Sequence, residues 1–162
     1  MPEGASTTTS AATGAVHPDP QALSEAVRAA MYDRDHAAQA LGIAVPEVGP
    51  SYAVCTMTVR PDMVNGHGIL HGGLCFTLAD TAFAYACNSH DLVTVASSCA
   101  VTFCAPAKLG DVLRAEARET WRQGHSGVTD VTVTSQDGTV IAQFRGNSRT
   151  LKGRVTEAMA HG

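Results

Sequence analysis

The most apolar stretch of the chain is His71–Ser89, where Leu, Cys, Phe, Ala and Tyr side chains follow one another with few interruptions. Wound as a helix, this stretch would be apolar nearly all round, and a helix of that kind is buried on most of its faces. It would run for about five turns, or roughly 28 Å, enough to fill the middle of a small domain. The pattern therefore predicts a central, buried helix.

Two shorter helices are expected before it. Asp19-Pro20 combines a capping residue with proline at the first helical position, which is typical of a helix start. A second helix is predicted over His36–Leu41 and should end at Gly42, since glycine is favoured just after a helix. From Gly42 the pattern of apolar and polar residues changes from that of a helix to that of strands. Ile43–Val48, which is interrupted by Pro46, suits an edge strand.

Alternation of polar and apolar residues then predicts strands. Ser51–Arg60 alternates well, Pro61–Leu70 reads as a loop, and Asp137-Gly138 is a strong hairpin signal, whereas Gly124-His125-Ser126-Gly127 is interpreted as a turn. Beyond the central helix the strand candidates are Val93–Phe103, Val112–Arg122, Val128–Gln136 and Thr139–Leu151. This order predicts an α+β domain in which a curved antiparallel sheet wraps one long central helix.

Composition narrows the classes of function. The net charge of -4 argues against nucleic acid as a partner, and no apolar run reaches the roughly 20 residues of a membrane span. No secretory signal is recognised at the N-terminus, so we expect a cytoplasmic protein. The cysteines are odd in number and lie inside apolar patterns, so reduced thiols are expected. His67 and His71 stand among glycines that disfavour a helical ligand pair, and no metal site is expected.

Asp80 is the unusual residue of the central helix. Aspartate is a poor helix former, and an unpaired carboxylate is costly to bury. Carboxylates in dry surroundings are common in active sites, although Asp80 alone could equally face solvent or bond to a neighbouring strand.

His71-Gly72-Gly73 lies at the expected start of the same helix, where N–H groups are unpaired and the dipole is positive. Glycine also lets a ligand approach the backbone closely. An N–H aimed at a thioester carbonyl would stabilise the charge that forms there during attack. By itself, the same motif could simply shape a tight turn into the helix.

Spacing connects the two features. Eight residues separate Gly72 from Asp80, which is about 12 Å along a helix, whereas one reacting carbonyl needs both groups within about 3–3.5 Å. Two antiparallel copies of the helix would bring Gly72 of one chain near Asp80 of the other. The spacing therefore predicts a two-fold homodimer with composite sites.

The run from Asn65-Gly66-His67-Gly68 through His71-Gly72-Gly73 and Leu78-Ala79-Asp80-Thr81 to Asn88-Ser89 closely resembles the PaaI-type thioesterases. The similarity continues through Val95–Pro106 and Phe144–Ser148 and covers roughly residues 36–151. The resemblance implies a hotdog fold, a tetramer of two dimers, and hydrolysis of acyl-CoA thioesters, notably hydroxyphenylacetyl-CoA of phenylacetate catabolism, without a cofactor.

By the same resemblance, Asp80 would be the nucleophile or the base that activates water, and the N–H of Gly72 would polarise the carbonyl. Asn65 and His71, together with Gly73, would shape the thioester pocket. Related thioesterases hold the water with a hydroxyl on the strand after the helix. Ser97 and Ser98 are candidates for that role, although the alignment favours Ala96.

Several expectations stay open at this stage. Arg145, Arg149 and Lys152 are candidates for the CoA phosphates, or merely a solvated final strand. A medium-chain or benzoyl-type preference, a non-catalytic acyl-CoA sensor and a hotdog hydratase are alternatives to the arylacetyl thioesterase. The domain is expected over residues 22–152, between a flexible tail at 1–21 and a flexible end at 153–162.

Overall fold

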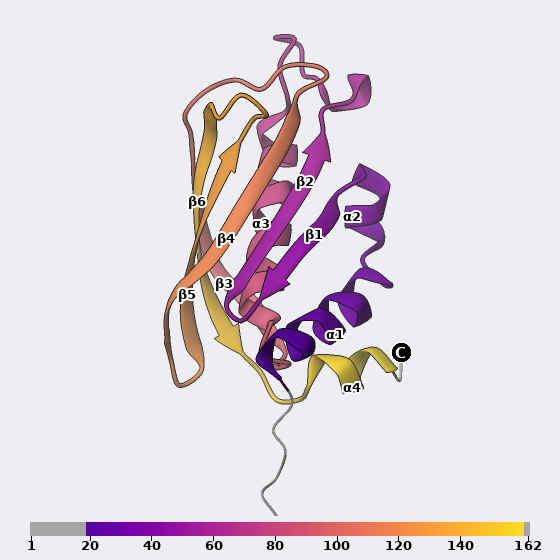
Figure 1. The fold of residues 1–162 in the computed structure, drawn as a ribbon. Helices are drawn as coiled ribbons and strands as arrows, with labels where there is room; N and C mark the ends of the chain where they lie inside the picture. The colour runs from indigo at the N-terminus through magenta and orange to yellow at the C-terminus, as the bar shows by residue number, and fades with distance from the viewer. Residues whose placement is uncertain (1–18, 161–162) are drawn as a thin grey trace, which may run out of the picture.

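The computed structural model describes residues 19–160, which form one sheet and its surrounding helices (Figure 1). Residues 1–18 of the expected tail lie outside the described part. In chain order the elements are α1 (Pro20–Tyr32), α2 (His36–Leu41), β1 (Ala44–Gly49), β2 (Tyr52–Thr58), the 3-10 turn η1 (Pro61–Met63), α3 (Gly72–Asn88), β3 (Thr94–Phe103), β4 (Val112–Gln123), β5 (Ser126–Thr134), β6 (Val140–Thr150) and α4 (Val155–Ala160). No helix within residues 19–160 combines the length and the apolar character needed to cross a bilayer.

A single six-stranded sheet in the order β1-β2-β4-β5-β6-β3, antiparallel throughout, wraps around α3. Figure 1 shows α3 lying behind β2 and β4, with α1 and α4 beside one end of the helix. The predicted hotdog arrangement, with one central helix inside a curved antiparallel sheet, is therefore confirmed.

The core lies between α3 and the concave face of the sheet. Leu78, Ala79 and Ala82 of α3 are completely buried, and so are Val131 and Val133 of β5. These side chains are small or branched, which lets the helix approach the strands closely. The all-round apolar profile of His71–Ser89 thus reflects a helix covered on most of its faces, as predicted.

Local signals at the element ends were predicted correctly. The Asp19 carboxylate accepts a hydrogen bond from Ala22 N–H at the start of α1, and Gly42 ends α2 with a φ of 68°. Strand β1, which contains Pro46, lies at one edge of the sheet and is irregular between Ala44 and Glu47. Proline removes one backbone donor, and at an edge this costs no sheet bond.

Three boundaries differ from expectation. Helix α1 begins at Pro20, so Pro20 and Gln21, which were assigned to the tail, belong to the helix. Only Gly124 and His125 form the turn before β5, because the ladder with β4 already pairs Gln123 with Ser126. Residues 153–160, expected to be flexible, instead contain α4, and Val155 at its start is buried.

Glycine is required at position 146, where β6 passes α3. A Cβ built there would come within 2.5 Å of the Phe83 ring, and Phe83 also packs against Phe144 with ring centroids 5.9 Å apart. Because aromatic rings in a packed core cannot shift freely, β6 and α3 depend on this missing side chain for their close approach.

We expect Gly146→Ala to lower the free energy of unfolding by about 1–3 kcal/mol, because the added methyl overpacks the α3–β6 contact. Urea unfolding followed by circular dichroism measures the change. Gly66→Ala is the matched control, since a Cβ at Gly66 has no neighbour within 4 Å. Equal stability of the two variants would show that the contact is not tight.

Candidate functional site

The start of α3 presents unpaired backbone donors. His71 caps the helix, and its Nδ1 accepts a hydrogen bond from Gly73 N–H at 3.0 Å. The capping residue itself is fixed, because His71 N–H donates to the carbonyl of Met63 at 2.9 Å. Among residues 19–160, no group accepts a hydrogen bond from Gly72 N–H. This N–H, at the positive end of the helix dipole, is therefore available to an anionic oxygen.

Gly72 opens onto a first cavity of about 480 Å³. Asn65 lines the same cavity, and its side-chain oxygen accepts hydrogen bonds from His67 N–H at 2.9 Å and Ile69 N–H at 3.5 Å. The Phe103 ring lies against Gly72, where a Cβ would come within 3.0 Å of it. Because Gly72 has no side chain, a ligand in the cavity can approach its backbone closely. We refer to this space as the amide cavity.

Asp80 lines a second cavity, of about 340 Å³, which shares no lining residue with the first. The carboxylate is half-buried, and its Oδ1 faces the Cys99 thiol on β3 at 3.9 Å. Burial raises the pKa of Asp80, and the Cys99 thiol partly opposes that rise by donating toward the carboxylate. We refer to this space as the carboxylate cavity; its other walls are mostly apolar, with side chains from Met31, Phe83, Val95, Val155 and Ala158.

Within one subunit, the Gly72 N–H and the Asp80 carboxylate therefore belong to different cavities, although one reacting carbonyl would need both. The helical rise puts Gly72 and Asp80 about 12 Å apart, as the spacing predicted. Gly73 does not line either cavity, and the exposed His71 contributes its capping nitrogen only to the helix start.

The two serines considered as water ligands point elsewhere. The β3–β6 pairing shifts register between Ala96 and Ser98, and both serine hydroxyls bond to Asn147 of β6. Ala96, rather than a serine, lines the carboxylate cavity. On this strand the thiol of Cys99 donates a hydrogen bond to the Asp80 carboxylate, a contact that the apolar pattern around Cys99 did not predict.

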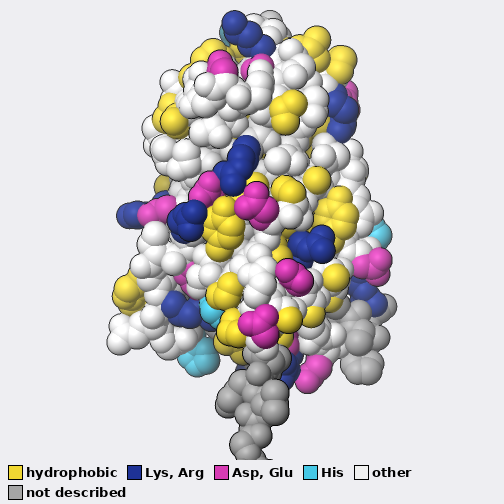
Figure 2. All heavy atoms as spheres, in the orientation of Figure 1, with side chains coloured by type: hydrophobic (Ala, Val, Ile, Leu, Met, Phe, Trp, Pro, Cys, Tyr) yellow, Lys and Arg dark blue, Asp and Glu magenta, His cyan; other side chains and the backbone are white. Residues whose placement is uncertain are grey.

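The basic candidates for the CoA phosphates line neither cavity. Arg145 forms a bidentate ion pair with Asp130 at 2.6 and 2.7 Å, whereas Arg149 and Lys152 are exposed. In the face of the sheet that Figure 2 shows, basic and acidic side chains are interspersed with apolar ones. Phosphate binding by Arg149 and Lys152 stays a prediction, and Arg145 is already neutralised by its partner.

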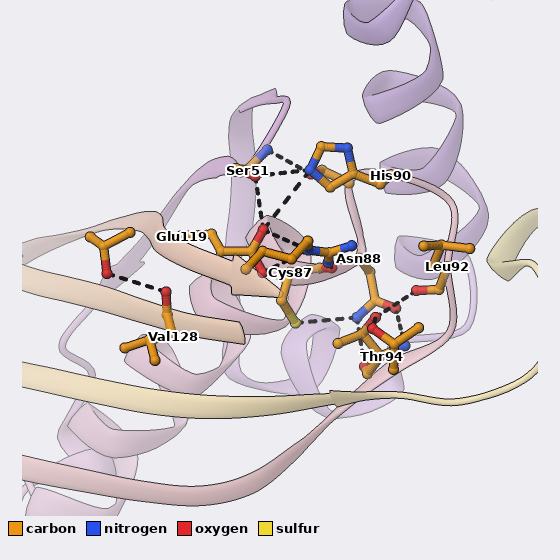
Figure 3. Close-up of polar contacts among 12 residues, drawn as sticks. Ser51, Cys87, Asn88, His90, Leu92, Thr94, Glu119 and Val128 are labelled. Atoms are coloured by element: carbon orange, nitrogen blue, oxygen red, sulfur yellow. Dashed lines mark hydrogen bonds and ion pairs between the residues drawn. The ribbon is translucent and has the colours of Figure 1, made fainter. Parts of the chain in front are cut away.

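The far end of α3 is held by a polar network that the sequence did not indicate (Figure 3). Arg122 donates to the Cys87 carbonyl at 2.7 Å and to the buried carboxylate of Glu119 at 3.0 Å, which also accepts from Ser51 Oγ at 2.8 Å. A cation at the last carbonyls of a helix complements its dipole. The Asn88 amide donates to the Thr94 carbonyl and accepts from Thr94 N–H, both at 2.8 Å, joining α3 to β3.

Within the described residues, no three His, Cys, Asp or Glu side chains lie closely enough together to bind a metal ion. All five cysteines are free thiols.

Comparison with known proteins identifies the family and agrees with the fold. Residues 67–142 match the thioesterase superfamily. The chain is 46% identical over 127 residues to the acyl-coenzyme A thioesterase PaaI of Escherichia coli, covering 78% of this chain and 91% of that protein. It is 31% identical over 129 residues to human acyl-coenzyme A thioesterase 13, covering 77% of this chain and 91% of the relative. The solved structure of E. coli PaaI superimposes with a TM-score of 0.83 at 42% identity, over 84% of this chain and 99% of that one.

We expect Glu119→Ala to destabilise the fold by about 1–3 kcal/mol, because Arg122 and Ser51 would lose the buried carboxylate that accepts their partly buried hydrogen bonds. Thermal unfolding checks this. Asp62→Ala is the control: it also removes a carboxylate paired with an arginine, but at a side chain that is 65% exposed, where an ion pair contributes about 0–1 kcal/mol. A smaller effect for Glu119→Ala than for Asp62→Ala would contradict the role given to the network.

Proposed function

Since the chain belongs to the thioesterase superfamily and, within it, to the PaaI-type acyl-CoA thioesterases, we propose that it hydrolyses arylacetyl-CoA thioesters to the free acid and CoA. Phenylacetyl-CoA and its ring-hydroxylated forms, the substrates of phenylacetate catabolism, are the expected class. The observation that carries this proposal is the half-buried Asp80 carboxylate in the wall of a mostly apolar cavity, on the same helix as the unpaired Gly72 N–H.

The active unit is a homodimer formed through β3. This strand lies at an edge of the sheet, runs for ten residues without a charged side chain, and exposes Val95 and Phe103 by 44% and 54%. Natural edge strands are usually short, charged or covered, because open edges pair with other chains. Antiparallel pairing of two copies of β3 would continue the sheet and place the two α3 helices side by side. The tetramer of two dimers would need a second interface.

In such a dimer, the amide cavity of one subunit and the carboxylate cavity of the other form one site. The thioester carbonyl oxygen accepts a hydrogen bond from Gly72 N–H, which stabilises the developing oxyanion. Asp80 of the other subunit either takes a proton from the attacking water or attacks the carbonyl itself, giving an anhydride that water then cleaves. Both routes break the C–S bond, release CoA as a thiolate and yield the carboxylic acid, and neither needs a metal or organic cofactor.

The size of the carboxylate cavity supports a compact aromatic acyl group. An apolar cavity of about 150 Å³ is enough to hold benzene, so about 340 Å³ can take a phenyl ring and its methylene linker. A long alkyl chain would meet the helices that close this space. A medium-chain acyl-CoA is for this reason the second choice. The five free thiols fit a reducing compartment, and we place the reaction in the cytoplasm.

Mixing two inactive variants tests the composite site. Asp80→Asn and Gly72→Pro should each lower kcat by about 10²–10³ or more, since one removes the carboxylate and the other the N–H. Subunit exchange between them creates dimers in which one site keeps both native groups. About a quarter of wild-type CoA release should then return, because half of randomly formed dimers are mixed and each has one intact site of two.

Gly72→Ala separates the two effects of the proline variant: its Cβ meets the Phe103 ring at 3.0 Å, but the N–H is kept, so its loss of kcat should be smaller than that of Gly72→Pro. Mixtures that stay inactive after verified subunit exchange would mean that each subunit completes its own site. If the wild-type chain binds phenylacetyl-CoA without releasing CoA, the protein is a sensor rather than a hydrolase.

The pH dependence of kcat/KM should report the environment of Asp80. The active form is the carboxylate, and burial raises its pKa, so activity should fall with decreasing pH through a value above the ordinary aspartate range of about 4. Cys99→Ala removes the thiol that opposes this rise, so the acid limb should move to higher pH. Cys104→Ala, at a thiol that donates instead to the Thr102 carbonyl, should leave the limb in place. A limb that moves to lower pH in Cys99→Ala would contradict the assigned contact.

A further inference from the structure

The carboxylate cavity is closed on one side by a segment outside the wrapped sheet. Its lining includes Asp80 and Ala84 of α3 and Val95 of β3, but also Met31 of α1 and Val155 and Ala158 of α4. Helix α4 follows the last strand and packs on α1, as Figure 1 shows at the end of the molecule where both lie. Two helices remote in sequence therefore meet at the same cavity as the proposed catalytic carboxylate.

A buried aspartate holds α4 in this position. Asp91, which is 2% exposed, accepts hydrogen bonds from Arg154 Nε at 2.7 Å, Thr156 N–H at 2.9 Å and Thr156 Oγ1 at 3.0 Å. Burial by itself would raise the pKa of Asp91, but the bonds from Thr156 and Arg154 together outweigh it and leave the pKa lowered. We call these contacts the Asp91 latch.

The backbone around the latch is shaped for the same purpose. Asp91 has a φ of 59° and Gly153 a φ of 110°, and both values lie in the region that most side chains avoid. Between them, Val93 N–H donates to the Gly153 carbonyl at 3.2 Å and Leu151 N–H to the Val93 carbonyl at 2.7 Å. These bonds set the direction in which the chain leaves β6, and so the place where Val155 enters the wall.

From this arrangement we propose that α4 is the end wall of the acyl pocket and that the Asp91 latch, by holding it, limits the length of acyl group that the enzyme accepts. The inference rests on the proposed thioesterase function. Val155 and Ala158 act as specificity-determining residues, and Arg154 and Thr156 as positioning residues. An arylacetyl group ends before the wall, whereas a longer alkyl chain must displace it.

A substitution in the cavity lining and substitutions in the Asp91 latch should have opposite effects on the length of acyl group that the enzyme accepts. CoA release is measured for acetyl-, phenylacetyl- and decanoyl-CoA. Ala158→Phe fills the pocket, so the ratio of kcat/KM for phenylacetyl-CoA to that for acetyl-CoA should fall about tenfold or more, the effect of one or two misfitting carbons. The double variant Arg154→Gln, Thr156→Val loosens the latch, so the ratio for decanoyl-CoA to phenylacetyl-CoA should rise about tenfold.

Glu157→Gln is the matched control, because Glu157 lies on the same helix with its side chain 70% exposed, and an exposed ion pair such as its 4.0 Å contact with Arg154 contributes little. Both ratios should stay at the wild-type value. Circular dichroism checks the fold of each variant, and Val155→Ala, which shortens the wall without adding bulk, replaces any variant that does not fold and should raise the decanoyl ratio.

The outcomes separate the two proposals. A wild-type chain that releases CoA from none of the three substrates overturns both the thioesterase function and the end wall. An active wild type whose α4 variants keep the wild-type ratios overturns the end wall alone.

Discussion

A helix rises about 1.5 Å per residue, and this constraint governs how the molecule can use α3. Gly72 and Asp80 stand on one rigid element, so no change of side-chain rotamer can bring the amide and the carboxylate to the same carbonyl. Each group has a cavity of its own in the single subunit. A site that needs both must be completed by a second chain, and the uncharged edge strand β3 offers the surface for it.

A site that takes its amide from one α3 and its carboxylate from another works only if each α3 is held firmly at both ends. At its start, His71 bonds to Met63 and caps the helix, which leaves the Gly72 N–H with a fixed direction. At its end, Arg122 binds the Cys87 carbonyl, and Asn88 joins the helix to β3. Preorganised donors stabilise a transition state without the cost of reorientation, so in the proposed mechanism these anchors support catalysis by holding α3 in place.

The surroundings of Asp80 balance two requirements. The carboxylate must be dry enough to gain basicity, yet it must stay ionised to react. Burial raises its pKa, and the neighbouring Cys99 thiol tempers that rise. The apolar walls that produce the burial are also the walls of the proposed acyl pocket, so under this proposal one environment both raises the pKa of Asp80 and selects the substrate.

Patterns among residues close together in the sequence determined most of the secondary structure of this protein. The position of α3, the caps Asp19 and Gly42 and the succession of strands along the chain depend on residues a few positions apart, and these were predicted, whereas the pairing of β3 with β6 was not. The spacing of Gly72 and Asp80, with the resemblance to a family, also identified the candidate groups. Only the tertiary structure decided which long-range partners meet. The register shift in β3 turns Ser97 and Ser98 toward Asn147, and Arg154 reaches Asp91 across 63 residues. Such contacts follow from strand register and chain direction, which residue periodicity does not encode, so the lining of the carboxylate cavity, including the part that α4 contributes, could not be predicted from sequence.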